Sequence, residues 1–311
     1  AKSCLAVTLR HQGDYAGAQA LQEQVLESQI RVLGPEHPDT LGTMGNLANA
    51  LRRQGECAAA QDLDEQVVES RSRVLGPEHP DTVGAMGDLA GTLWCQGDLT
   101  GAQDLYEQVL ELKTRILGPE HPRTLGTMGD LAGVLWDQGD YPGAQAIQEQ
   151  VLEAQTRALG PEHPDTLGTM GGLANTLGNL GDLEGAQALQ EQVVEAQTRA
   201  LGPEHPDTLW AMGNLAITVG NLGDYAGARD LEELVVEART RVLGPEHPDT
   251  LGAMANLAIT LWYLGDHAGA QDLVEQVVEL RSRALGPEHP DTLWARDLLG
   301  AIDENAQQHA E

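Results

Sequence analysis

Aromatic residues and positive charges are scarce in this sequence. Its 311 residues include no phenylalanine, and aromatic residues make up only 3%. Because aromatic side chains dominate the buried surface of most cores, we do not expect a conventional globular core. Lysine and arginine total 18 against 48 aspartate and glutamate residues, a formal net charge of −30. Nucleic acids and anionic membranes both attract basic proteins, so this charge argues against either as a partner.

Long apolar runs and paired cysteines are missing too. No apolar run reaches the length of about 18 residues that a membrane-spanning helix needs, and the first ten residues lack the features of a signal peptide. The cysteines, Cys4, Cys57 and Cys95, form no Cys-x-x-Cys motif and share no place in the repeat described next. We therefore expect no disulfide framework and no cysteine site, and predict a reducing, cytoplasmic location.

The sequence is instead rich in repetition. The string GPEHP recurs every 42 residues, and the residues between its copies repeat as well. A fixed period of this size predicts a repeat array. We expect a partial repeat over 1–33, six full repeats, and a single C-terminal helix with a polar tail over 286–311. The full repeats are predicted at 34–75, 76–117, 118–159, 160–201, 202–243 and 244–285.

Each repeat predicts two amphipathic helices. In the repeat that begins at Gly34, Pro38 suits the first helical turn and Gly55 suits the helix end. One apolar face of the first helix comprises Leu41, Met44, Leu47, Ala48 and Leu51. The second helix carries Ala60, Leu63 and Val67, with Val74 and Leu75 closing the repeat. Neither helix buries its stripe alone, so stacking of the repeats into an all-α solenoid is predicted.

Charged residues in the repeat are interpreted as structural. Every second helix carries a Glu–Arg pair four residues apart, such as Glu69 and Arg73. The Glu-His of GPEHP is interpreted as turn chemistry, because successive copies lie about 10 Å apart by helix packing, too far to share one ion. Residues outside the pattern, namely His11, His267 and Asp137, are interpreted as drift. We expect no catalytic residues, metal or cofactor, and no enzyme activity, since no known catalytic motif occurs.

The run GDLAGVLWDQGDYPGAQAIQEQVLE resembles a tetratricopeptide repeat. Ala48, Gly55 and Ala60 match the small residues at the crossing of its two helices. The 42-residue length, opened by HPDT and closed by LGPE, is most similar to repeats of kinesin light chain and related bacterial proteins. The resemblance implies a right-handed superhelical solenoid that acts as a protein-interaction scaffold. Such arrays hold a peptide or partner segment in a concave groove formed by the first helices.

Beside the buried face of each first helix runs a second stripe, here called the groove stripe, which lines the concave face in related repeats. In the first full repeat it is Gly42, Gly45, Asn49 and Arg52. Most repeats place two or three glycines on it, each costing about 0.5–1 kcal/mol relative to alanine. Two explanations stay open: close approach between the backbones of successive first helices, or a groove cleared of side chains for a partner.

The tryptophans concentrate on the groove stripe, where the repeats vary most. Tryptophan is enriched at binding hot spots, although each could instead fill space beside a neighbouring glycine. The candidate partner-binding residues are Trp94, Trp136, Trp210, Trp262, Tyr263, Trp294, Asn49, Arg52, Asn175, Asn179 and Asn221.

The sequence departs from kinesin-light-chain-like repeats at one place. Those repeats carry two successive asparagines on the first helix, the first of which contacts peptide backbone. Here glycine or alanine occupies that first place, as at Gly45, and the second survives as Asn46, Asn214 and Asn256. The chain has no groove lysine to hold a terminal carboxylate. A neutral or basic protein or peptide is therefore the expected partner on electrostatic grounds.

Two alternative functions stay open. The incomplete repeats at the ends would expose Leu5, Leu9, Leu293, Leu298 and Leu299 unless capped, which favours head-to-tail self-association. By family analogy alone, the array could also serve as the sensor of a larger signalling ATPase.

Overall fold

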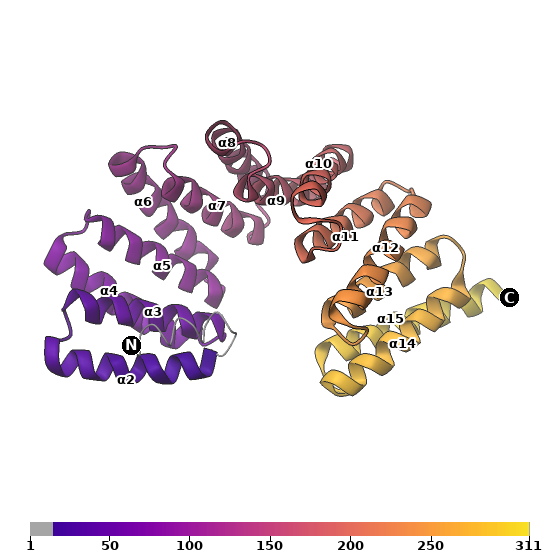
Figure 1. Cartoon of the computed structure of the whole chain (residues 1–311), viewed down its shortest axis with the longest axis horizontal. Helices are drawn as coiled ribbons and strands as arrows, with labels where there is room; N and C mark the ends of the chain where they lie inside the picture. The colour runs from indigo at the N-terminus through magenta and orange to yellow at the C-terminus, as the bar shows by residue number, and fades with distance from the viewer. Residues whose placement is uncertain (1–14, 311) are drawn as a thin grey trace. The chain divides into compact units, whose positions relative to one another are not determined.

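The computed structural model describes residues 15–310, whose regular elements are all α-helices joined by short turns (Figure 1). The earlier helices are α2 (Tyr15–Leu33), α3 (Pro38–Arg53), α4 (Cys57–Leu75), α5 (Pro80–Gln96), α6 (Leu99–Leu117), α7 (Pro122–Asp137) and α8 (Tyr141–Leu159). The later ones are α9 (Pro164–Leu180), α10 (Leu183–Leu201), α11 (Pro206–Asn221), α12 (Tyr225–Leu243), α13 (Pro248–Tyr263), α14 (His267–Leu285) and α15 (Pro290–Ala310).

The chain divides into two compact units, unit 1 (Ala1–Ala154) and unit 2 (Gln155–Glu311), and the division falls within α8. Inside each unit a helix packs against its neighbours in sequence. First helices of consecutive repeats also touch, as α3 does α5 in unit 1 and α11 does α13 in unit 2. Consecutive packing of this kind confirms the predicted all-α, tetratricopeptide-like solenoid. The exact repeat boundaries stay a prediction.

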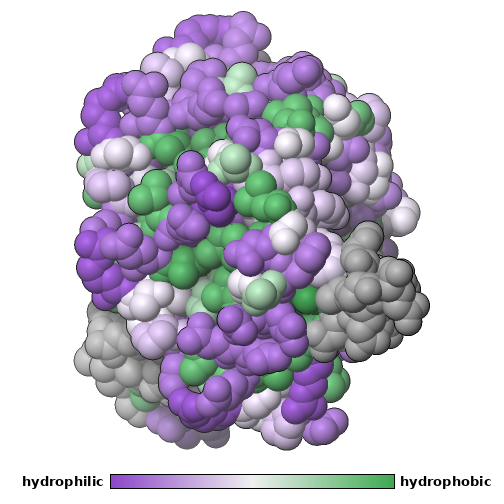
Figure 2. All heavy atoms as spheres, turned by 90° about the vertical axis from the view of Figure 1, so that its right-hand side faces the viewer, coloured by the Kyte–Doolittle hydropathy of each residue, from purple (hydrophilic) through white to green (hydrophobic). Residues whose placement is uncertain are grey.

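Small and branched residues build the core, which explains how the chain folds without phenylalanine. The alanine at the crossing of each helix pair is fully buried, as at Ala60, Ala102 and Ala228. The predicted stripe of the second helix is wrong at its end, because Val74 and Leu75 are exposed. They lie in the last turn of α4. Elsewhere, Figure 2 shows hydrophobic residues in gaps between bands of hydrophilic ones.

The GPEHP segments form the turns between repeats, as predicted. His37 is the N-cap of α3, and its Nδ1 accepts the Asp39 backbone N–H at 3.2 Å. The Thr40 hydroxyl donates to the Gly34 carbonyl at 2.9 Å, tying the helix start to the preceding turn. The predicted Glu–Arg pairing within second helices occurs in unit 2 at 195–199, 237–241 and 279–283. The arginine also pairs with the glutamate of GPEHP, as Arg115 does with Glu78 at 2.7 Å.

The expectation of no disulfide is wrong. Cys57, at the start of α4, and Cys95, near the end of α5, form a disulfide with their Cα atoms 6.0 Å apart. Because consecutive helices run antiparallel, the start of α4 lies beside the end of α5. The repeat pattern conceals this contact, since the two cysteines occupy different places in their repeats. The disulfide removes the cysteine argument for a reducing location.

The ends of the array differ from expectation where the structure describes them. Leu298 and Leu299 on α15 are partly buried against a core that includes Ala258 and Val274, so they are less exposed than an uncapped end would leave them. Leu293 is exposed, as expected. Cys4, Leu5, Leu9 and His11 lie outside the described residues. Among the helices of residues 15–310, none has both the length and the apolar composition needed to cross a membrane.

Candidate functional site

In unit 2, large apolar side chains on or beside the groove stripe are exposed. Trp210 on α11 is 54% exposed, and Tyr263 on α13 is 60% exposed. Ile217 and Trp294 are exposed too, and the guanidinium of Arg281 lies 5.4 Å from the Trp294 ring centre. Exposed aromatic and branched side chains gathered on one kind of helix face form a candidate contact surface.

Trp94 in unit 1 differs, because the protein itself covers much of it. Its indole packs where a Cβ at Gly133 on the next first helix would lie, 2.5 Å from Cη2. The indole Nε1 donates to Asp137 Oδ2 at 2.6 Å. Asp137 is therefore a partner of Trp94, and its interpretation as drift is wrong. For Trp94, the space-filling alternative describes the structure.

Trp136 and Trp262 pack against aromatic rings. Trp136 contacts Tyr141 edge to face, with ring centres 5.9 Å apart, and Trp262 lies over His267 at 4.0 Å. His267 therefore packs against a tryptophan, which corrects its interpretation as drift. Tyr141 and His267 each begin the second helix of the repeat whose first helix carries the tryptophan. They therefore hold the indole beside the turn that joins the two helices. These contacts orient Trp136 and Trp262 without burying them fully.

Among the polar candidates, Asn49 and Arg52 lie together in unit 1. Asn49 Oδ1 accepts from Arg53 Nε at 3.3 Å. Arg52 reaches the next repeat, where its Nη1 donates to the Asp88 carbonyl at 3.1 Å. Its guanidinium occupies the place of a Cβ at Gly91. Arg52 therefore bridges two repeats.

The remaining asparagine candidates lie in unit 2. The Asn179 amide donates to the Asn175 carbonyl one helical turn earlier, at 2.9 Å, so these two lie together on α9. Asn221 is exposed at the end of α11.

The glycines of the groove stripe separate into two kinds. A Cβ at Gly91 or Gly133 would collide with Arg52 or Trp94. At most other stripe positions it would meet nothing within 4 Å, as at Gly42, Gly45, Gly84, Gly126, Gly129, Gly168, Gly178, Gly213 and Gly252. The close backbone approach offered as one explanation is therefore wrong, because the atoms near these glycines belong to side chains or are absent. The glycines leave open space over the first helices.

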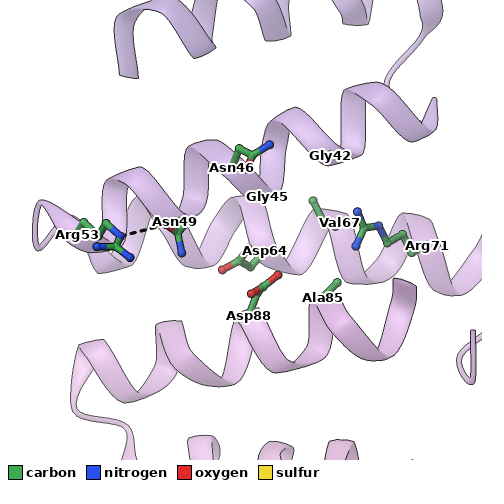
Figure 3. A pocket seen from close by; sticks show the side chains of 10 residues that line it. All are labelled: Gly42, Gly45, Asn46, Asn49, Arg53, Asp64, Val67, Arg71, Ala85 and Asp88. Carbon is green, nitrogen blue, oxygen red and sulfur yellow. Dashed lines mark hydrogen bonds between the residues drawn. The ribbon is translucent and has the colours of Figure 1, made fainter. Parts of the chain in front are cut away.

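A cavity of about 520 Å³ lies on this face of unit 1, between α3, α4 and α5. Asn46 and Asn49 of α3 lie on one side and Asp88 of α5 on the other (Figure 3). Asp64 of α4 points into the space between the two first helices, towards Asp88. The remaining lining residues are Gly42, Gly45, Arg53, Val67, Arg71 and Ala85.

The two carboxylates in this cavity differ in environment. The Asp64 side chain is 3% exposed, and its Oδ2 accepts the Thr92 hydroxyl at 2.7 Å. Loss of water by burial raises the pKa of Asp64 to about 6, against the opposing effect of the Thr92 hydrogen bond. Asp88 reaches solvent in the cavity, yet the surrounding protein also raises its pKa, mainly by desolvation and against the charge of Arg52.

Asp64 occupies a place on the second helix that is polar in every repeat except the last. The same place in the repeat holds Gln22, Asp64, Tyr106, Gln148, Gln190, Glu232 and Val274. Glu232 is 5% exposed, and its Oε2 has no hydrogen-bond partner among the described residues. Burial raises the pKa of Glu232 to about 7, although a hydrogen bond from Thr260 opposes the shift. A polar residue on an otherwise apolar stripe was the available sequence signal for Asp64.

Comparison with known proteins agrees with this arrangement. Tetratricopeptide-repeat models match residues 1–73, 39–115, 81–154, 123–184, 168–240 and 250–291. The chain belongs to the tetratricopeptide-repeat family. Among curated sequences none matches significantly.

Solved tetratricopeptide-repeat structures resemble the chain. One holds the nearly identical repeats of a proposed kinesin light chain from Podosopora anserina, with 31% identity and a TM-score of 0.60 over 66% of this chain and 97% of that one. Another is BtubC (BKLC) from P. vanneervenii, with 21% identity and a TM-score of 0.62 over 74% and 92%. A third is a signal-transduction ATPase with a tetratricopeptide-repeat sensor from Pyrococcus horikoshii, with 12% identity and a TM-score of 0.70 over 97% and 44%.

Tetratricopeptide repeats generally mediate protein–protein interactions. This chain has two chemically different surfaces on its first helices. Unit 1 offers a charged cavity, and unit 2 offers exposed apolar rings. Sequence reasoning found the rings but missed Asp64 and Asp88. Neither was predicted, because Asp64 lies on a second helix and meets Asp88 only where that helix packs against the first helix of the next repeat.

Proposed function

We propose that this tetratricopeptide-repeat chain is a non-enzymatic scaffold that binds a peptide segment of a partner protein along the groove stripe. The observation that supports it most is the exposure of Trp210, Ile217 and Tyr263 in unit 2. Tyr263 also stacks on Tyr225, with ring centres 4.7 Å apart, which holds its ring in place. Rigid, exposed aromatic side chains provide large contact area at low entropy cost. The open space above the stripe glycines leaves room for a main chain.

A display experiment tests this function directly. Random dodecapeptides shown on phage are selected against the whole chain, and the affinity of each enriched peptide is measured by fluorescence polarisation. Trp210→Ala combined with Tyr263→Ala is expected to weaken binding about tenfold or more, as loss of hot-spot residues does. The matched control is Leu234→Ala, because Leu234 on α12 is equally exposed but lies on a second helix.

Two outcomes would contradict the proposal. Selection that enriches no peptide rejects peptide binding altogether. Equal affinity for the control and the double variant rejects the groove stripe as the binding face. The alternative function, head-to-tail self-association, is tested by sedimentation across a concentration series. A chain that stays monomeric at every concentration excludes it.

A further inference from the structure

The cavity of unit 1 is lined by two aspartates and two arginines, and neither aspartate forms an ion pair among the described residues. The charges of Arg52, Arg71 and Lys113 act on Asp88 from beyond ion-pair distance. Among the described residues, no lysine, arginine or histidine nitrogen lies within 4.0 Å of the Asp64 or Asp88 carboxylate oxygens in an ion pair. The nearby arginines use their hydrogens elsewhere: Arg52 donates to the Asp88 carbonyl, Arg71 to the Asp81 carbonyl at 2.8 Å and Arg53 to Asn49. Asp64 is almost fully buried, and the Thr92 hydroxyl donates to its Oδ2.

The two carboxylates lie at the centre of the cavity. Arg53 and Arg71 lie at opposite ends, and the two aspartates face each other between them (Figure 3). Two facing carboxylates repel each other when both are ionised, and each has lost part of its hydration. A cation between them would relieve both effects at once.

The sequence places two carboxylates together at this repeat junction alone. At each junction in the sequence, the residue at the place of Asp64 can be compared with the residue at the place of Asp88 in the following repeat. These pairs are Gln22 and Asn46, Asp64 and Asp88, Tyr106 and Asp130, Gln148 and Gly172, Gln190 and Asn214, Glu232 and Asn256, and Val274 and Leu298. Packing of the repeat does not require acids here, because glutamine and asparagine occupy the same places at other junctions.

We propose that this cavity binds a lysine or arginine side chain of the partner segment, with its charged group held between the Asp64 and Asp88 carboxylates. The inference rests on the proposed function, because it names a partner chemistry for the groove stripe of unit 1. Asn46 and Asn49 also line the cavity, and amide groups can bond a main chain. Gly42 and Gly45 leave the space that such a main chain needs.

A metal ion is a poorer occupant than an organic cation. A tightly bound divalent ion takes several ligands, six or so for magnesium and calcium. In the part of the chain that the structure describes, no three His, Cys, Asp or Glu side chains gather in a way that could hold a metal. Two carboxylates and a few amide oxygens instead match an ammonium or guanidinium, which needs several acceptors around one charge.

The test compares charge dependence in paired variants of the whole chain. Dodecapeptides enriched by display on the unaltered chain are expected to share one lysine or arginine at a fixed position. Replacing it by norleucine or citrulline, which remove the charge, is expected to lower the affinity about tenfold or more. Asp64→Asn with Asp88→Asn is expected to abolish this difference. Asp62→Asn with Asp104→Asn removes the same net charge from exposed outer positions and is expected to preserve it.

Each contrary result has a separate meaning. Peptides that bind without a fixed basic residue, or a charge dependence that survives in the Asp64–Asp88 variant, overturn this inference and leave the proposed function standing. Loss of charge dependence upon addition of EDTA assigns the cavity to a metal ion and also overturns it. Absence of any bound peptide rejects both proposals. If circular dichroism shows that the variant with Asp64→Asn unfolds, the charge dependence is measured with Asp88→Asn alone, because Asp88 is exposed to solvent.

Discussion

The indole of Trp94 on α5 lies over Gly133 on α7, so a side chain from one repeat fills the space that a glycine leaves in the next. Arg52 and Gly91 repeat the relationship one junction earlier. In both cases the glycine occupies the same place in its repeat. At these two positions glycine is therefore required by packing, unlike the glycines that face open space.

Substitution of two glycines on α7 distinguishes the glycine that packing requires from the glycine that faces open space. Gly133→Ala is expected to destabilise the chain by about 1–3 kcal/mol, because the new methyl group displaces the Trp94 ring. Gly126→Ala, where a Cβ meets nothing within 4 Å, is expected to stabilise it by about 0.5–1 kcal/mol through helix propensity. Denaturant unfolding measures both changes. A stabilising Gly133→Ala in the unaltered chain would contradict the packing of Trp94 described above.

A carboxylate buried in unit 2 predicts a pH-dependent stability. Burial raises the pKa of Glu232 from 4.5 to about 7, so the folded state holds its proton more tightly than the unfolded state. Its contribution to stability is therefore greatest below pH 4.5 and is lost as pH rises through about 7. Relative to Glu232→Gln, the unaltered chain is expected to lose on the order of 2 kcal/mol between pH 5 and pH 8.

The glutamine variant suits this comparison because Gln190 occupies the same place one repeat earlier. Thermal unfolding of both chains at a series of pH values gives the difference. A parallel pH dependence in the two chains would show that Glu232 ionises as it does in the unfolded state. Glu233→Gln, at the exposed neighbouring residue, controls for the change in net charge.

The sequence alone predicted the features that recur in every 42-residue repeat. Pro38, His37 and Gly34 mark the turns, and Ala60 marks the helix crossing, because each acts within its own repeat. Features that join different places of neighbouring repeats were missed. Asp64 meets Asp88 and Cys57 meets Cys95 only after a second helix packs against the next first helix, and a comparison of equivalent positions does not show that contact.

The disulfide between Cys57 and Cys95 predicts a redox-dependent stability of unit 1. It joins residues 38 apart in sequence, and a cross-link of that span stabilises a fold by about 3–4 kcal/mol, chiefly by restricting the unfolded chain. Reduction by dithiothreitol is therefore expected to lower the midpoint of thermal unfolding. Cys57→Ala with Cys95→Ala is expected to lower it as well and to remove the effect of the reductant.

Cys4→Ser is the matched control for this prediction, because it removes the remaining thiol and leaves the disulfide in place. Its unfolding midpoint is expected to keep the full response to dithiothreitol. Peptide mapping without reductant identifies the linked pair directly. A Cys4 cross-link in that map, or an unfolding midpoint that ignores the reductant in the unaltered chain, would show that α4 and α5 are held together by side-chain packing alone.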